Sequence, residues 1–468
     1  MEKPAIEKRE LLWLFAILIV GFLIRFAIWN NTAETGLYIT DEKDYALLAQ
    51  NLLAGNGFAW EEGKPTSIRP PGYPTFIAAI WFITGDQDPQ SVRFVQILLS
   101  LFSIALLYRI GRIAFSSNVA LLAAGIFSLY PTYVGFASFL YAEVLFIFLM
   151  LFVILVYLRM TNASVSLFSL ATTAGLLLGL AALTRTIAWP YFLVFVPLVL
   201  FTVGNDLKTR LKASSAVVLG FFLIIAPWSY RNSELQNQFT LIDTMGGMNL
   251  MMGNYEHTPL NRAWDAVSLL STDKRWSYSL GSIPESADWG EAERSKWASD
   301  QAKQFMLSHP LLTIERSIAK FFSFWGLERV IIAAWERELY HPPKWSIPVL
   351  AVVINSAYIL TMLLAVVGLF LAPPNEQKFH YLVWTLLVVF TGVHMLIFGH
   401  ARYHLPLMPL LILYAASAVD RRAWKALLDK KLAAYIAMLC IALLLLIWGR
   451  EVFFIEGDRI ATLMKSIR

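Results

Sequence analysis

Long apolar runs recur along the whole chain, and they constrain the fold more than any other feature. A helix that crosses a bilayer needs about 20 mostly apolar residues, with roughly 17 to 25 acceptable. Segments that meet this requirement lie near residues 11–29, 92–114, 118–137, 142–158, 166–183, 187–203, 213–229, 347–372, 380–398, 403–419 and 432–449. The mean hydropathy is +0.58, and only 15% of the residues are charged. The sequence therefore predicts an all-α polytopic membrane protein with about 11 transmembrane helices.

The remaining composition agrees with a membrane protein and excludes several other classes. The chain has 16 Trp and 18 Tyr, which suit the two interfacial belts of a bilayer. Its single cysteine, Cys440, lies in an apolar run, so neither a disulfide framework nor a cysteine metal site is expected. The net charge of +5 could indicate nucleic acid, but the basic residues stand in short loops between spans. We interpret them as orienting charges, and expect no nucleic-acid partner.

The placement of basic residues predicts the orientation. Cytoplasmic loops are enriched in Lys and Arg. With the N-terminus inside, these loops hold Arg109, Arg112, Arg159, Lys208, Arg210, Lys212, Lys378, Arg421, Arg422, Lys425, Lys430 and Lys431. Counting the run Gly72 to Thr84 as a span would move most of these clusters outside. That run has only 13 residues, so we expect it to be interfacial or re-entrant. We expect a multi-pass protein of the inner (cytoplasmic) membrane.

This topology gathers the polar segments on the outer face. We expect an N-terminal transmembrane part (1–229) whose outer loop 30–91 holds the active site, followed by an extracytoplasmic segment (230–346). A C-terminal transmembrane part (347–449) and an extracytoplasmic tail (450–468) complete the chain. Within 230–346, a helical pattern runs from Ser286 to His309, and the stretch from Leu311 to Phe324 is apolar enough to lie on the membrane surface.

The first outer loop contains a predicted short helix with acidic residues in its first turn. Thr40 is the expected N-cap and Gly55 the expected C-cap. Asp41 and Glu42 follow Thr40, where the helix dipole favours their ionised forms. Acidic residues also decorate helix starts without any function. The functional interpretation is a general base held at the edge of the bilayer.

Several cations and polar residues are candidates for the same outer site. Arg69 precedes two prolines, and a residue before proline is held in extended backbone. Glu143 and Arg185 stand at outer ends of spans, where a charge is costly unless it is paired or faces water. Arg402 and His404 lie in the motif HARYHLP. Each of these residues taken alone could equally be an ordinary interfacial side chain.

Two patterns resemble metal ligands, and neither predicts a metal site. Asp86 and Asp88 stand in a turn before Pro89, where turn chemistry explains them. His400 and His404 are four residues apart, but Pro406 close by makes a poor metal site. We expect no metal ligands.

The ordered set of motifs resembles the glycosyltransferases that use polyprenyl-phosphate sugars. These are the protein O-mannosyltransferases and the aminoarabinose (lipid A) transferases of the GT-C membrane fold. The pieces are Asp41-Glu42 in the first outer loop, YALLAQNLLAGNGF, RPPGYP, LYAE (140–143), GLAALTR (179–185), APWSYRN (226–232), GGMNLMMGN (246–254), HPLLTIERSIAKFFSFW (309–325) and ARYHLPLMPLL (401–411).

The resemblance implies roles for individual residues. Asp41 matches the acidic residue that deprotonates or orients the acceptor hydroxyl, with Glu42 as its neighbour. Arg69 matches the cation that contacts the lipid phosphate, although some relatives have lysine or histidine in this segment. Arg185 and Arg402 are further candidates for that phosphate. The residues assigned to the substrate pocket are Tyr45, Tyr73, Glu143, Tyr403 and His404.

The chemistry of such a donor fits this set of residues. A polyprenyl phosphate is already a good leaving anion, so the site must supply cations for the phosphate and one base for the acceptor. We expect a single displacement with inversion, with no cofactor and no required divalent metal. The partners are the membrane lipid carrier and an acceptor lipid, glycan or protein.

A transporter or flippase of a lipid-linked sugar is the competing class. Transporters place their ionisable and helix-breaking residues near the bilayer midplane, often in repeated halves. Here those residues collect at one face, and the sequence has no matching halves. A purely structural scaffold does not explain the large one-sided loops. The sequence favours the transferase.

Overall fold

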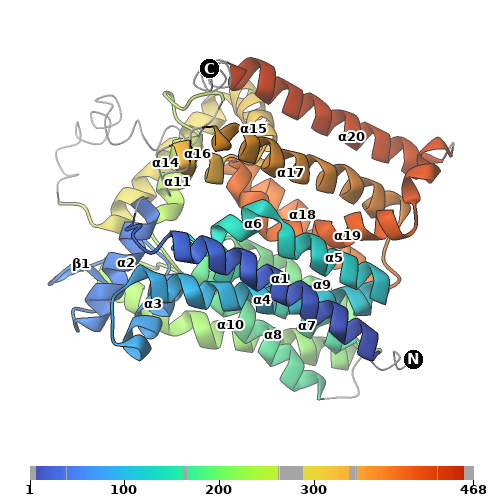
Figure 1. The fold of residues 1–468 in the computed structure, drawn as a ribbon. Helices are drawn as coiled ribbons and strands as arrows, with labels where there is room; N and C mark the ends of the chain where they lie inside the picture. Colours follow the sequence, from blue (N-terminus) through green and yellow to red (C-terminus); the bar gives the residue numbers. More distant parts are fainter. Residues whose placement is uncertain are drawn as a thin grey trace.

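The computed structural model is a bundle of long helices with shorter elements gathered at one end (Figure 1). It describes residues 7–37, 40–161, 166–261, 263, 288–336, 343, 345–429 and 431–457. In this part of the chain, nine helices are long and apolar enough to cross a membrane. They are α1 (Lys8–Asn31), α4 (Pro89–Ala114), α7 (Glu143–Thr161), α8 (Leu167–Thr184), α10 (Leu207–Gln236), α17 (Ser346–Leu371), α18 (Gln377–Leu396), η3 (Ala401–Leu407) with α19 (Met408–Asp420), and α20 (Leu432–Arg450) with η5 (Glu451–Ile455). The all-α fold class is confirmed.

Two of the expected spans form shorter helices. The predicted span 118–137 is divided into α5 (Ser117–Leu129) and α6 (Pro131–Phe136), and 187–203 becomes the 15-residue α9 (Ala188–Thr202). The division at Tyr130 has a local cause, because Pro131 lacks an N–H and disfavours helical backbone in the residue before it. Tyr130 accordingly has the extended angles φ −64° and ψ 111°. The total of eleven spans stays a prediction.

Burial distinguishes central from peripheral helices. Within α7, 67% of the most apolar window is buried, whereas the corresponding figure for α1 is 11%. The outer surface of α1 is apolar, as expected of a helix that faces lipid. The structure thus puts α7, whose first residue is Glu143, among other helices.

Helices α8 and α10 approach each other closely through glycines. A Cβ atom on Gly175 would lie 2.1 Å from the Val217 carbonyl oxygen, and one on Gly220 would lie 2.3 Å from that of Thr172. Small residues let membrane helices pack backbone to backbone. This contact positions α8, and Arg185 follows directly after the C-terminal end of that helix.

The shorter elements form the end of the bundle that carries the first loop. They comprise α2 (Thr40–Leu53), β1 (Ala59–Glu61), β2 (Lys64–Pro65), α3 (Gly72–Thr84), α11 (Met245–Gly253), α14 (Glu291–Ser308), α15 (Pro310–Phe324) and α16 (Val330–Glu336). The remaining short helix, η4 (Ala423–Leu428), precedes α20. Figure 1 shows α2, α3, β1 and α11 together, far from the N-terminus of α1.

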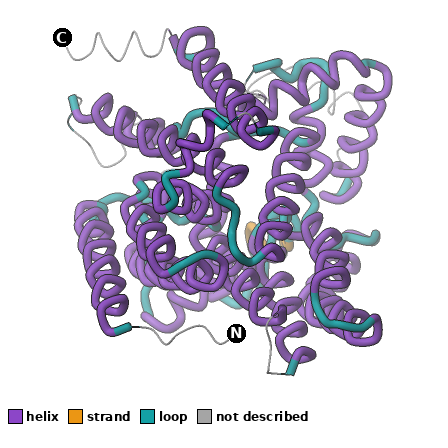
Figure 2. The backbone as a smooth tube through the Cα atoms, turned by 90° about the vertical axis from the view of Figure 1, so that its right-hand side faces the viewer, coloured by secondary structure: helices purple, strands orange, loops and turns teal. Residues whose placement is uncertain are grey.

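The predicted helix in the first loop is confirmed as α2. Gly55 follows it with φ +83°, the left-handed conformation expected of a C-terminal glycine. A small antiparallel hairpin, β1–β2, then turns at Gly63, which has φ +73°. This hairpin, drawn in orange in Figure 2 among the purple helices, was not predicted from the sequence.

The predicted helix from Ser286 to His309 corresponds to α14, and Ser286 itself lies outside the described residues. Helix α15 then begins at Pro310, and it is strongly amphipathic. Leu311 and Ile314 are 82% and 58% exposed, whereas Lys320 is buried. Such a helix suits the membrane surface, as expected for 311–324.

Candidate active site

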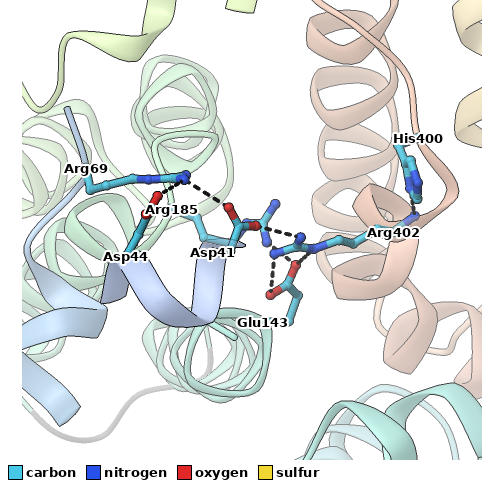
Figure 3. Close-up of polar contacts among 7 residues, drawn as sticks. All are labelled: Asp41, Asp44, Arg69, Glu143, Arg185, His400 and Arg402. Atoms are coloured by element: carbon cyan, nitrogen blue, oxygen red, sulfur yellow. Dashed lines mark hydrogen bonds and ion pairs between the residues drawn. The ribbon is translucent and has the colours of Figure 1, made fainter. Parts of the chain in front are cut away.

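Six charged side chains from distant parts of the sequence meet at one point (Figure 3). They are Asp41 and Asp44 from α2, Arg69 from the loop before α3, Glu143 at the start of α7, Arg185 just after α8, and Arg402 from η3. We call this set the charge network. Arg69, Glu143, Arg185 and Arg402, which were singled out from separate sequence motifs, thus join Asp41 in a single cluster.

Arg69 links two carboxylates of the same helix. Its Nη2 donates to Asp41 Oδ1 at 2.9 Å and to Asp44 Oδ2 at 2.7 Å. Residues three apart in a helix lie on the same face, so both carboxylates reach one guanidinium. The prolines after Arg69 restrict its backbone, which keeps this cation directed at α2.

Arg402 connects α2 to the centre of the bundle. Its Nη1 donates to Asp41 Oδ2 at 3.0 Å, and its Nη2 donates to Glu143 Oε2 at 3.2 Å. The Arg402 Nε and the Arg185 Nη1 both donate to Glu143 Oε1. Glu143 is fully buried, and a buried carboxylate requires such cations because it has lost its water.

Aromatic rings line the network beside the guanidinium groups. The Arg402 guanidinium lies 3.9 Å from the centre of the Tyr141 ring, and that of Arg185 lies 5.4 Å from the Tyr403 ring. Arg69 lies 5.6 Å from the Tyr45 ring. Aromatic faces attract cations and add no carboxylate, so they orient the arginines without neutralising them.

The electrostatics keep Asp41 ionised. Burial by itself raises the pKa of Asp41, but the charges of Arg402 and Arg69 outweigh it and leave the pKa below its usual value. A neighbouring carboxyl behaves in the opposite way. Burial raises the pKa of Asp243 to about 6, although the Met245 N–H, the Thr186 hydroxyl and Arg69 oppose the shift.

Glu42 contacts the backbone of the turn before α7. Its Oε1 accepts a hydrogen bond of 2.9 Å from the Leu140 N–H, and the residue is 1% exposed. Glu42 therefore fastens α2 to the turn that leads to Glu143. Its place in the structure is that of a positioning residue for Asp41.

Two of the residues assigned to the substrate pocket lie beneath the site. Tyr73 is fully buried, donates its hydroxyl to Gln96 at 2.8 Å, and meets the Tyr45 ring edge to face. His404 is fully buried between the rings of Trp325 and Tyr358. Tyr45 and Tyr403, in contrast, contact the arginines of the charge network.

His404 anchors the element that carries Arg402. Its Nδ1 lies 2.6 Å from the Phe324 carbonyl oxygen, and its Nε2 lies 3.4 Å from Glu328 Oε1. At the start of η3, the His400 Nδ1 accepts a hydrogen bond of 2.9 Å from the Arg402 N–H. Both histidines thus hold η3 in place.

The Asp86-x-Asp88 pair forms a turn, as predicted, and Asp88 also caps α4. Asp88 Oδ1 accepts a hydrogen bond from the Gln90 N–H at the start of α4, and Asp86 Oδ1 accepts one from the Asp88 N–H. Among the residues that the structure describes, no three His, Cys, Asp or Glu side chains are grouped to hold a metal ion.

Two acidic residues of this region were not singled out from the sequence. Asp44 was detectable, because it follows Asp41 by three residues within a predicted helix and so shares its face. Asp243 had no local signal, since its partner Thr186 is far away in the sequence. Only the packing of the 240–245 segment against the end of α8 brings it close.

Comparison with known proteins agrees with the fold. Residues 68–230, about a third of the chain, match the family model described as dolichyl-phosphate-mannose-protein mannosyltransferase. This range includes Arg69, Glu143 and Arg185. No protein with a curated description matches the sequence.

Several solved structures are similar to the chain. The archaeal oligosaccharyltransferase of Archaeoglobus fulgidus, in complex with an inhibitory peptide and a dolichol-phosphate, has a TM-score of 0.52 at 13% identity, over 93% of this chain and 54% of that one. An Archaeoglobus fulgidus oligosaccharyltransferase tethered to an acceptor peptide has a TM-score of 0.52 at 14% identity, over 93% of this chain and 53% of that one. ArnT of Cupriavidus metallidurans bound to undecaprenyl phosphate has a TM-score of 0.42 at 18% identity, over 89% and 78%.

These comparisons confirm that the chain has the GT-C membrane fold. The chain spans about half the length of the oligosaccharyltransferase structures that it matches.

Proposed function

We propose that this protein is an inverting glycosyltransferase that moves a sugar from a polyprenyl-phosphate carrier to a hydroxyl acceptor on the outer face of the membrane. The observation that carries the proposal is the charge network, in which one partly exposed carboxylate, Asp41, stands between Arg69 and Arg402. A base beside phosphate-binding cations is the minimum that this reaction needs.

The reaction assigns a role to each group. Asp41 accepts the proton of the acceptor hydroxyl while the acceptor oxygen attacks the anomeric carbon. The bond from that carbon to the phosphate oxygen breaks, and its electron pair leaves with the polyprenyl phosphate. Arg69, Arg185 and Arg402 stabilise the phosphate as its charge grows. The scheme requires neither a general acid nor a divalent metal.

The same network links donor binding to the strength of the base. Arg69 and Arg402 keep the pKa of Asp41 low, which makes it a weak base in the free enzyme. A donor phosphate that engages these arginines neutralises part of their charge, so the Asp41 pKa rises. Asp41 thus becomes a better proton acceptor when the donor is in place.

Glu143 positions the cations. It is fully buried and pairs with both Arg185 and Arg402, so it fixes their separation. Rigidly held cations bind the phosphate at little cost in free energy, because they need no reorganisation. Glu42 and His404 support the same arrangement from α2 and η3.

The comparisons support a lipid-phosphate donor. The matched family model is described by dolichyl-phosphate-mannose, and the similar oligosaccharyltransferase was solved with a dolichol-phosphate. The position of the network supports a transferase over a flippase. The network includes α2 at one end of the bundle, whereas transport sites lie near the middle of the membrane (Figure 1).

Asp41→Asn tests the proposal, because it removes the base and keeps the shape. Transfer would be followed from a panel of purified polyprenyl-phosphate sugars to membrane lipids, glycans or proteins. We expect turnover to fall by about two to four powers of ten. Glu62→Gln, an exposed charge in the hairpin turn, should keep full activity. Glu42→Gln should reduce turnover less than Asp41→Asn does.

Full turnover of a correctly inserted Asp41→Asn protein would contradict the proposed base. Flipping of the lipid-linked sugar in proteoliposomes, without transfer to any acceptor, would indicate the transporter instead.

A further inference from the structure

Asp44 is the third carboxylate of the charge network. Within the described part of the chain, its one ion-pair partner is Arg69, at 2.7 Å. The Arg69 Nη2 is shared with Asp41 at 2.9 Å. The adjacent Arg69 Nε is buried and donates to no described group. Arg69 is therefore occupied on one nitrogen by two carboxylates and, among the described groups, still has an unused donor.

The network as a whole has no spare positive charge. It contains three guanidinium groups and three carboxylates, so its formal charge is zero. A phosphate that enters adds negative charge to a neutral cluster in a poorly solvated place. Binding is more favourable if one carboxylate gives up its cation.

The contacts identify which carboxylate can leave. Glu143 is fully buried and held by two arginines, and Asp41 is also held by two. Asp44 is held by one. The side chains of Asp41 and Asp44 are both 26% exposed, so either carboxylate regains some water when an ion pair breaks. Release of Asp44 costs least because it breaks one ion pair, whereas release of Asp41 breaks two.

We propose that Asp44 holds the place of the donor phosphate on Arg69 and is displaced when a polyprenyl phosphate binds. This inference rests on the proposed function and deepens it by naming the residue that sets donor and product affinity. The exchange makes and breaks only ionic contacts.

The same exchange bears on product release. The donor is a phosphodiester with one negative charge, whereas the product is a monoester whose second pKa is about 6, so it carries more charge at pH 7. Arginines that bind the donor therefore bind the product more tightly. When Asp44 returns to Arg69, it helps the product to leave.

Asp44→Asn is the central test, because the amide keeps the size and removes the charge. The Michaelis constant for the donor should fall by about two- to tenfold, and the inhibition constant for polyprenyl phosphate should fall at least as much. If both constants are unchanged or rise, Asp44 merely orients Arg69 and the proposal is wrong. Asp44→Ser should also lower both constants. It replaces Asp44→Asn in the test if the Asp44→Asn protein does not fold.

Two controls make the result specific. Glu62→Gln removes an exposed charge from the same loop and should change neither constant. In an Arg69→Ala background, Asp44→Asn should not lower the two constants further, because the cation for which Asp44 and the phosphate compete is gone. A decrease of equal size in that background would overturn the proposal.

A binding measurement separates this inference from the proposed reaction. Farnesyl phosphate would be titrated into the purified full chain by calorimetry, with inorganic phosphate in a second arm to separate the headgroup from the prenyl chain. Tighter binding by Asp44→Asn, with no transfer by the wild type, would support the inference and reject the transferase. Transfer by the wild type, with equal binding by the two proteins, would reject the inference alone.

Discussion

At the scale of single residues, the candidate site is a case of charge compensation. Glu143 has no exposed surface, and it tolerates burial because Arg185 and Arg402 both contact it. Arg69 differs, since its two carboxylates lie at the edge of the site and are partly exposed. We therefore expect Arg69 to be the cation most available to a ligand.

Arg69→Ala should lower kcat/KM by about one to two powers of ten. A charge-assisted contact is worth roughly 1.5–3 kcal/mol, and 1.36 kcal/mol corresponds to a factor of ten. The loss should appear in kcat as well as in KM, because the phosphate gains charge as the bond breaks. Arg69→Lys should recover part of it, since the charge remains while the planar fork is lost.

The measurement is transfer at several donor concentrations. Unchanged kcat and KM in Arg69→Ala would exclude this arginine from the site and leave Arg185 and Arg402 for the phosphate.

At the scale of elements, close backbone contacts hold α11 and α15 against the segment that carries Arg402. A Cβ atom on Gly253, at the end of α11, would lie 1.7 Å from the Ile397 carbonyl oxygen. One on Gly399 would lie 2.1 Å from the Lys320 carbonyl oxygen. These contacts join α11 and α15 to the turn that leads into η3 and Arg402.

Gly253→Ala should therefore destabilise the protein by about 1–3 kcal/mol, because the added methyl group forces the backbone apart. Gly246→Ala is the matched control in the same helix. No atom lies within 4 Å of its added Cβ, so alanine should be neutral or stabilising by up to about 1 kcal/mol. Thermal unfolding of the detergent-solubilised proteins would compare them. Equal melting temperatures would mean that α11 does not depend on this contact.

At the scale of the whole molecule, the proposed reaction depends on orientation in the membrane. The predicted topology puts loop 30–91 outside and the loop containing Lys208 inside. Glu62 lies in the hairpin turn and Lys208 near the start of α10, and both are exposed. Each is a suitable site for a reporter cysteine.

A cysteine at Glu62, in a Cys440→Ser background, should react with a membrane-impermeant maleimide in intact spheroplasts. A cysteine at Lys208 should react only after the membrane is opened. The reverse pattern would overturn the topology and put the candidate site on the cytoplasmic side.

The sequence by itself determined the features that depend on near neighbours. Runs of about 20 apolar residues specified the helical membrane class, and cap and turn residues located α2 and the break between α14 and α15. Pro131 is a local signal for the division between α5 and α6. That division was nevertheless not predicted, because the expected span was assigned from its hydrophobic composition, which does not change at a break in the backbone.

Only the tertiary structure decided which charges meet. Asp41 and Arg402 are separated by 361 residues, and their ion pair exists because the first turns of α2 and η3 lie together in the bundle. Glu42, adjacent to Asp41, turns to the Leu140 backbone instead, because successive residues of a helix point about 100° apart. Local sequence specifies where a helix begins and which side chains share its face, whereas the partner of a charge depends on where packing brings the other helix ends.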